Sequence, residues 1–276
     1  MENNSSYKVN SISSSMELEI KRLQAQVNLF WEKEVKHYKE FGMVSGMKIV
    51  ELGCGPGFVL EKLNEEFDDV ELTGVEIDDC LVEYAKKNLE KHKNITVQPG
   101  SILDINLPDN TYDFAIARLV IEHLDDPIAA IKEVTRILKP GGKAIFVDND
   151  FEMHIECYPE IIELRDLYDA YCTARVQENG NPKIGRLLPL LLKKGGLSNI
   201  DIEVIVAHSE LIGDEAFLKS EGVGIPSQLV KCGLLSSKTM GKISVKWRQM
   251  LRSEEHVMLR QLYLCVGEKL VCSLKE

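Results

Sequence analysis

Long apolar runs are absent from this chain of 276 residues. No stretch approaches the roughly 20 consecutive apolar residues that a bilayer-spanning helix needs. The opening MENNSSYKVNSISSS is polar and lacks the apolar segment of a secretory leader. We therefore expect a cytoplasmic protein without a membrane partner.

The chain has fewer basic than acidic residues. The sequence carries 33 Lys and Arg residues against 44 Asp and Glu residues, which gives a formal net charge of −11. An acidic surface repels phosphate backbones, and no basic run with interleaved aromatic residues offsets that charge locally. Nucleic acid is therefore not an expected partner.

Cysteines are scattered, and their number is odd. The seven positions, none with the spacing of a metal site, are 54, 80, 157, 172, 232, 265 and 272. Reduced thiols are the simplest interpretation of such a pattern in a cytoplasmic protein.

The chain does contain a regular alternation of short apolar and amphipathic segments. The expected strands are residues 48–52, 71–76, 96–99, 112–117 and 143–148. The expected helices are residues 59–67, 80–92 and 127–138, preceded by an amphipathic helix from residue 15 to about 41. This order predicts an α/β fold with a parallel sheet covered on both faces, and right-handed crossovers make it doubly wound.

Beyond residue 151 the pattern is less regular. The expected elements are helices over 156–176 and 184–194, a strand over 199–207, a mostly helical region over 214–252 and a last strand over 261–270. No interior linker rich in Pro, Gly or Ser divides the chain. We therefore predict one structural domain.

A glycine-rich turn follows the first expected strand, in the segment Glu51-Leu52-Gly53-Cys54-Gly55-Pro56-Gly57. Alternate glycines let the chain turn sharply and bring its backbone against a ligand. The next helix points its positive N-terminal end at the same place. The dinucleotide fingerprint G-x-G-x-x-G fails here, because Phe58 or Leu60 occupies the position of the third glycine.

Two further segments complete a candidate nucleoside site. Glu76 ends the second expected strand, where an acidic side chain can accept hydrogen bonds from both ribose hydroxyls. The loop at residues 99–104 can supply a polar contact and an apolar wall to an adenine ring.

These segments closely resemble the motifs of the class I S-adenosylmethionine-dependent methyltransferases. The matching stretches are E-L-G-C-G-P-G-F at 51–58, G-V-E-I-D at 74–78, D-x-x-L-P-D-N-T-Y-D-F at 104–114, A-R-L-V-I-E-H-L at 117–124 and L-K-P-G-G at 138–142. The resemblance covers about residues 45–150. It implies a Rossmann-like sheet of seven strands in the order 3-2-1-4-5-7-6, whose last strand is antiparallel.

The resemblance also implies S-adenosyl-L-methionine as the cofactor, S-adenosyl-L-homocysteine as the product and a set of cofactor-binding residues. That set is Glu51, Gly53, Cys54, Gly55 and Gly57 around the methionine portion, Glu76 on the ribose, Ile77, Ser101 and Ile102 on the adenine, and Arg118 and His123 near the methyl group. Many relatives carry an acidic residue where this chain has Ser101.

The acceptor side is less defined. The cofactor carries the reactivity in methyl transfer, and a base helps only if the acceptor must lose a proton. His123 and Asp150 are the candidate bases, although His123 could instead hold its loop and Asp150 could cap the following helix. The candidate acceptor-pocket residues are Trp31, Asp148, Asn149, His154 and Tyr158. For the segment with Asp148 and Asn149 the alternative is a cap on the following helix, and for the other three it is packing or surface exposure.

The Asp-Asn pair after the fifth strand is also similar to that of metal-dependent catechol methyltransferases. Those enzymes carry a further acidic ligand where this chain has Arg118. Three oxygen ligands are then not assembled, and no metal ion is expected.

The resulting prediction is methyl transfer to an O, N or C nucleophile of a small molecule, a metabolite or natural-product intermediate, by a monomer or homodimer. Residues 1–41 would form a mobile N-terminus and helical lid, 42–150 the cofactor-binding core, and 151–276 the end of the sheet plus a helical cap. The alternatives are a non-catalytic S-adenosylmethionine-binding protein, a methyltransferase of nucleic acid or protein, and a nicotinamide-dependent oxidoreductase.

Overall fold

The computed structural model of the chain describes residues 16–221 and 224–271. Its strands are β1 (Lys48–Leu52), β2 (Glu71–Glu76), β3 (Ile95–Pro99), β4 (Tyr112–Arg118), β5 (Leu138–Asp148), β6 (Ile155–Tyr158), β7 (Ser198–His208) and β8 (Val257–Glu268). Its helices are α2 (Met16–Glu40), α3 (Phe58–Glu66), α4 (Asp79–Leu89), α5 (Pro127–Ile137), α6 (Leu164–Gln177), α7 (Leu188–Lys194), α8 (Ser209–Ile212), α9 (Asp214–Lys219), α10 (Gly224–Lys231) and α11 (Ser237–Met250). Three 3-10 turns join them, η1 (Ile121–His123), η2 (Phe151–Met153) and η3 (Gly185–Leu187).

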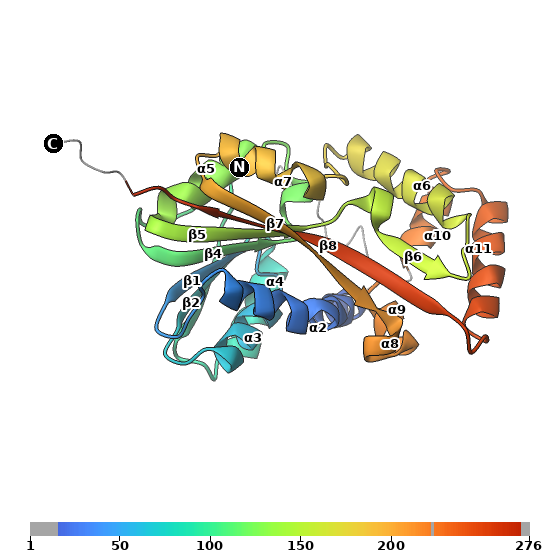
Figure 1. The fold of residues 1–276 in the computed structure, drawn as a ribbon, viewed down its shortest axis with the longest axis horizontal. Helices are drawn as coiled ribbons and strands as arrows, with labels where there is room; N and C mark the ends of the chain where they lie inside the picture. The colour runs from blue at the N-terminus through green and yellow to red at the C-terminus, as the bar shows by residue number, and fades with distance from the viewer. Residues whose placement is uncertain (1–15, 222–223, 272–276) are drawn as a thin grey trace.

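The first five strands form the parallel half of the sheet. β1 pairs with β2 and β4, β2 with β3, and β4 with β5, all in parallel. Side chains alternate between two hydrophobic clusters, so that Phe114 and Ile116 of β4 face one layer and Ala115 and Ala117 the other. Helices α2, α3 and α4 cover the first face and α5 and α7 the second (Figure 1). Burial on both faces explains the continuous apolar runs of these strands.

The long strand β8 closes the sheet in antiparallel register. One edge of β8 pairs first with β5, where Asp148 lies opposite Tyr263, and then with β6, where Ile155 lies opposite Arg260. The other edge pairs with β7. Counted without β6, the strands follow the order 3-2-1-4-5-7-6 with the last strand antiparallel, so the predicted α/β fold is confirmed.

The short strand β6 corrects the prediction of one long helix over residues 156–176. The chain instead forms β6, then a loop, and begins α6 at Leu164. Tyr158 precedes Pro159, and the residue before a proline is disfavoured in helical conformation. Pairing with residues 257–260 of β8 satisfies the backbone of this segment, and β8 accordingly starts four residues before the expected strand.

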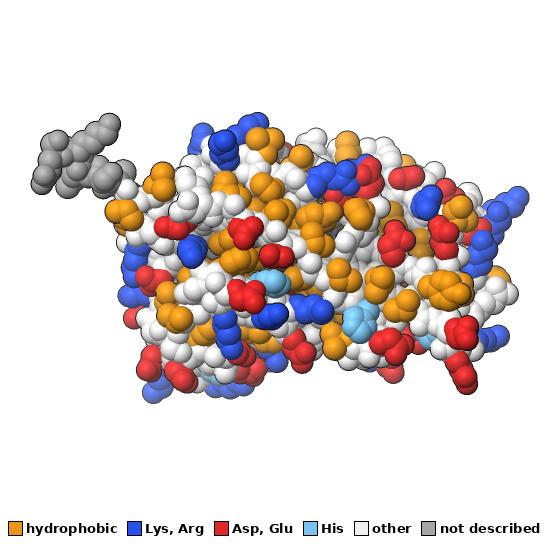
Figure 2. Space-filling view, viewed as in Figure 1, with side chains coloured by type: hydrophobic (Ala, Val, Ile, Leu, Met, Phe, Trp, Pro, Cys, Tyr) orange, Lys and Arg blue, Asp and Glu red, His pale blue; other side chains and the backbone are white. Residues whose placement is uncertain are grey.

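Two helical groups flank the carboxyl ends of the parallel strands. Helix α2 packs across the sheet beside α3, whereas α6, α10 and α11 gather around β6 and the far end of β8 (Figure 1). The predicted mobile N-terminus falls on residues 1–15, which lie outside the described residues. Acidic, basic and apolar side chains are interspersed on the face shown in Figure 2. Over the part of the chain that the structure describes, no helix has the length and apolarity needed to cross a bilayer.

Candidate functional site

The three glycines of the turn between β1 and α3 have two different roles, close packing and leaving room for a ligand. Gly53, Gly55 and Gly57 have φ angles of 71°, 52° and 83°. A Cβ on Gly53 would lie 2.4 Å from Val120 Cγ2, and one on Gly57 would lie 2.6 Å from Leu89 Cδ1. A Cβ on Gly55 would meet no described atom within 4 Å. Gly53 and Gly57 are therefore required for close packing, whereas Gly55 leaves open space above the turn.

Glu76, at the end of β2, holds this turn in place. Its carboxylate accepts hydrogen bonds from the backbone N–H groups of Gly55 (2.8 Å), Ile77 (2.8 Å) and Asp78 (2.9 Å). Burial raises the pKa of Glu76, although the three donors oppose that shift. The side chain thus fixes the glycine turn and at the same time borders the cavity beside it.

We call this space the glycine-turn cavity, of about 120 Å³. The predicted cofactor residues that line it are Glu51, Gly53, Cys54, Gly55, Glu76, Ile77, Arg118 and His123. Ser101 and Ile102 line an adjacent recess of about 50 Å³, which shares Gly53 and Ile77 with the cavity. Gly57 lies outside both, against α4. The structure therefore brings together nearly all the residues that the resemblance assigns to the cofactor.

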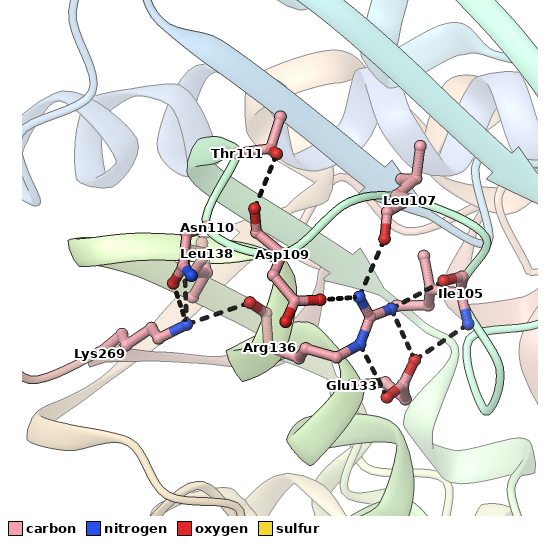
Figure 3. Close-up of polar contacts among 9 residues, drawn as sticks. All are labelled: Ile105, Leu107, Asp109, Asn110, Thr111, Glu133, Arg136, Leu138 and Lys269. Carbon is pink, nitrogen blue, oxygen red and sulfur yellow. Dashed lines mark hydrogen bonds and ion pairs between the residues drawn. The ribbon is translucent and has the colours of Figure 1, made fainter.

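The loop after β3, which carries Ser101 and Ile102, is held by Arg136 and Lys269 (Figure 3). Arg136 of α5 donates hydrogen bonds to the carbonyl oxygens of Ile105 (2.7 Å) and Leu107 (2.9 Å) and to Asp109 Oδ1 (2.6 Å). Lys269 donates to Asn110 Oδ1 (2.8 Å) at the end of the same loop. These contacts tie the adenine side of the site to α5 and to the chain after β8.

Helix α2 supplies one wall of the glycine-turn cavity. Arg118, at the end of β4, donates to Glu34 Oε1 of α2 (2.8 Å) and to the Gln26 carbonyl oxygen (3.1 Å). Tyr38 donates its hydroxyl to Glu34 Oε2 (2.8 Å). Beside this network Glu51 is buried, and burial raises its pKa well above the usual range. Within the described residues, Glu51 Oε2 has no hydrogen-bond partner.

A second cavity, of about 170 Å³, adjoins the first and shares Leu23, Gln26, Leu119 and His123 with it. We call it the polar cavity. Among the described residues, five buried polar atoms without hydrogen-bond partners belong to its lining: Glu122 Oε2, Asn149 Oδ1, His154 Nδ1, Arg175 Nε and Arg260 Nε. Buried polar groups are normally paired, so this concentration marks a place that fits a polar ligand.

Glu122 and His123 are neighbours in the polar cavity, and their pKa values are shifted in opposite directions. Burial raises the pKa of Glu122 to about 7, although Asn149 Nδ2 donates to its Oε1 (3.0 Å). Burial and the positive charge of Arg175 lower the pKa of His123 to about 3. Near neutral pH, Glu122 is therefore the group that titrates, and His123 stays uncharged.

The predicted acceptor-pocket residues do not all lie in one place in the structure. Asn149 and His154 line the polar cavity. Trp31 is instead packed in the core, edge-on to Tyr38 with ring centroids 6.3 Å apart. Tyr158 is 63% exposed at the end of β6.

Neither of the two acidic candidates, Asp148 at the end of β5 and Asp150 after it, is among the residues that line the polar cavity. Asp148 is fully buried, and its Oδ2 accepts from the Glu122 backbone N–H (3.1 Å), so it positions Glu122. Asp150 is ion-paired with Arg186 and accepts from the Glu152 backbone N–H (3.2 Å) as the cap of η2. This is the capping alternative considered above, and it leaves Asp150 away from the polar cavity.

Sequence reasoning did not assign Glu122, Glu221 or Arg260, all of which line the polar cavity, to the acceptor side. Glu122 stands beside His123 in a matching motif and could have been chosen on that signal. Glu221 and Arg260 come from the irregular C-terminal half, where no motif marks them. Within residues 16–221 and 224–271, no group of three or more His, Cys, Asp or Glu side chains is placed to hold a metal ion.

Comparison with known proteins places this site in a family context. Residues 50–146 match the family model described as a methyltransferase domain. The chain is 33% identical over 150 residues to an uncharacterized methyltransferase of Schizosaccharomyces pombe, covering 51% of this chain and 53% of that protein. It is 27% identical over 119 residues to the demethylmenaquinone methyltransferase of Staphylococcus aureus, covering 43% and 48%. The chain thus spans about half the length of these curated relatives.

Solved structures share the fold at low sequence identity. Phosphoethanolamine N-methyltransferase 2 of Haemonchus contortus, in complex with S-adenosyl-L-methionine, superposes with a TM-score of 0.58 at 18% identity, over 90% of this chain and 56% of that one. The YcgJ protein of Bacillus subtilis gives a TM-score of 0.54 at 15% identity, over 85% and 97%. At such identities the likeness establishes the fold alone.

Proposed function

Because residues 50–146 form a methyltransferase domain of the class I S-adenosylmethionine-dependent family, we propose that the protein transfers a methyl group from S-adenosylmethionine to a small molecule. The observation that carries this proposal is the junction of two cavities at His123 and Leu119. The glycine-turn cavity contains the glycine turn and Glu76, which are the features of a nucleoside site. The polar cavity presents polar atoms without hydrogen-bond partners to an acceptor.

The residues present fit the cofactor. The open space above Gly55 admits the nucleoside, with Glu76 beside the ribose and Ile77 beside the adenine. The buried, unpartnered Oε2 of Glu51 suits the amino group of the methionine portion, because that group supplies hydrogen-bond donors. The bound cofactor supplies an electrophilic methyl group on a sulfonium, and the protein's part is to orient the acceptor and exclude water.

Several observations support a small acceptor. The polar cavity lies between α2, η1 and the C-terminal helices, and its volume of about 170 Å³ suits a small polar group rather than a polymer surface. The net charge of −11 disfavours nucleic acid. The name of the Staphylococcus aureus relative also denotes a small-molecule acceptor.

We infer that Glu122, rather than the predicted His123, takes a proton from the acceptor when one must be lost. The Glu122 carboxylate borders the polar cavity, and its pKa of about 7 suits a base at neutral pH. The imidazole of His123, with a pKa of about 3, binds a proton too weakly for that role. His123 then serves to shape the boundary between the two cavities.

Isothermal titration calorimetry with S-adenosylmethionine and S-adenosylhomocysteine tests the proposal. We expect both to bind with one site per chain. Absence of heat with both ligands would contradict the proposal. Binding of both, without methyl transfer to any member of a library of amines, phenols and enols, would favour the non-catalytic alternative.

A further inference from the structure

A third cavity, larger and less polar than the other two, lies in the helical cap. It measures about 650 Å³, and we call it the cap cavity. Apolar and aromatic side chains of α6, α10 and α11 make up most of its wall: Leu164, Leu167, Tyr168, Pro226, Ile243 and Trp247. The elements that form it come together at the far end of β8 in Figure 1.

The cap cavity is adjacent to the polar cavity. The two share Phe151, His154, Tyr171 and Glu221. At this boundary Glu221 accepts from Arg260 NH1 (2.7 Å) and contacts His154 Nε2 (3.2 Å). These charged groups lie on the side toward the polar cavity, whereas the rest of the wall is mainly apolar, with Ser244 and Arg248 of α11 as its polar members. The three cavities form a series from the glycine turn to the cap.

The size and lining of the cap cavity are those of a ligand site. Pockets of about 300–1,000 Å³ lined mainly by apolar and aromatic side chains are typical of small-molecule sites. The cap cavity has that size and lining, and it shares a wall with the polar cavity.

We propose that the acceptor is amphipathic, with a polar reacting end held in the polar cavity and an apolar body held in the cap cavity. This inference rests on the proposed function for its polar end. The unpaired oxygens of Glu122 and Asn149 require donors, and the unpaired Nε atoms of Arg175 and Arg260 require acceptors. The reacting end therefore carries both kinds of group, as a hydroxyl-bearing ring or an enol does.

The apolar body is tested with straight-chain alkan-1-ols from butanol to decanol, which carry one hydroxyl and a chain of adjustable length. Trp247 lines the cap cavity, so its emission reports binding there. The variant Trp31→Phe removes the other tryptophan signal, because the chain contains only two tryptophans. We expect affinity to rise about fourfold with each methylene until the cavity is full.

A matched pair of variants in α11 locates the site. Ser244 lines the cap cavity, whereas Ser237 is exposed on the same helix. In the Trp31→Phe background, Ser244→Phe should weaken decanol binding by roughly tenfold by filling the space, and Ser237→Phe should leave it unchanged. S-adenosylmethionine binding, measured by calorimetry, should be the same in both variants.

The outcomes separate the inference from the proposed function. Alkanol affinity that is independent of chain length, or decanol binding that survives Ser244→Phe, would overturn the amphipathic acceptor while S-adenosylmethionine binding persists. Length-dependent alkanol binding without S-adenosylmethionine binding would overturn the proposed function and leave an apolar ligand site.

Discussion

Arg118 and Glu34 form a buried ion pair, with Arg118 NH2 at 2.8 Å from Glu34 Oε1. The two residues are 84 positions apart in the chain, and both side chains are almost fully buried. Arg118 ends β4 beside the glycine-turn cavity, and Glu34 belongs to α2. The pair therefore fixes the N-terminal helix against the site, where Leu23, Gln26 and Val27 of α2 complete the wall.

Removing Glu34 should destabilise the fold. Glu34→Ala would leave the Arg118 charge buried without its partner and Tyr38 without its acceptor. We expect a loss of about 3–5 kcal/mol in the free energy of unfolding, measured by urea denaturation. Glu17→Ala, which removes an exposed ion pair with Lys21 on the same helix, is the control and should produce no resolvable change. Equal behaviour of the two variants would refute the anchoring role.

Two glycines with open space above them give a matched test of the cofactor site. Gly55 and Gly46 both have positive φ, and an added Cβ would meet no described atom within 4 Å at either. Gly55→Ala and Gly46→Ala should each cost about 1–2 kcal/mol of stability from left-handed strain. Only Gly55→Ala should weaken S-adenosylmethionine binding, by roughly tenfold, because only Gly55 borders the cavity. Equal affinities in calorimetry would place the ligand elsewhere.

The pH dependence of activity distinguishes Glu122 from His123. A carboxylate accepts a proton only when deprotonated, so kcat/KM should rise with pH through about 7 and then level off. Glu122→Gln should lower kcat by about 10²-fold or more and remove the rise. His123→Asn should leave the midpoint in place, because the His123 pKa of about 3 lies below the range measured. A midpoint that moves with His123→Asn alone would reassign the base.

Stability should depend on pH through the same carboxyl group. Burial raises the pKa of Glu122 from its ordinary 4.5 to about 7, and burial also raises that of Asp148. The folded protein thus retains protons that the unfolded chain releases, so this contribution is complete below about pH 4.5 and is lost as pH rises through about 7. For Glu122 it amounts to about 3 kcal/mol. Urea midpoints from pH 5 to 8 should fall less in Glu122→Gln than in the wild type, and parallel curves would contradict the shift.

The hydrogen bonds from Arg136 to the loop after β3 should contribute both to the stability of the fold and to the affinity for S-adenosylmethionine. Arg136→Met removes the donors to the carbonyl oxygens of Ile105 and Leu107, at a cost of about 1–2 kcal/mol. The released loop carries Ser101 and Ile102, so S-adenosylmethionine affinity should also fall. Arg165→Met, which removes an exposed pair with Glu160, serves as the control in urea unfolding and calorimetry. Unchanged S-adenosylmethionine affinity in Arg136→Met would show that these hydrogen bonds do not contribute to cofactor binding.

The parallel half of the fold was predictable because its signals are local. The bounds expected for β1 and β2 coincide with those observed, since buried apolar runs are bordered directly by glycines and charged residues. β6 was not predictable, because residues 155–158 form a strand through pairing with residues 257–260, about 100 positions later. The ion pair of Asp150 was not predictable for a similar reason, because Arg186 approaches it from a separate turn, η3.

The sequence alone determined the glycine turn, the acid at Glu76 and the family to which they point, because turn geometry and strand periodicity depend on neighbours along the chain. Tertiary structure decided the chemistry of the acceptor side. Glu122 and His123 are adjacent in sequence, yet desolvation raises the pKa of Glu122 and lowers that of His123, and the charge of Arg175 lowers both. Such shifts depend on burial and on charges brought close by folding, and no local pattern specifies either of them.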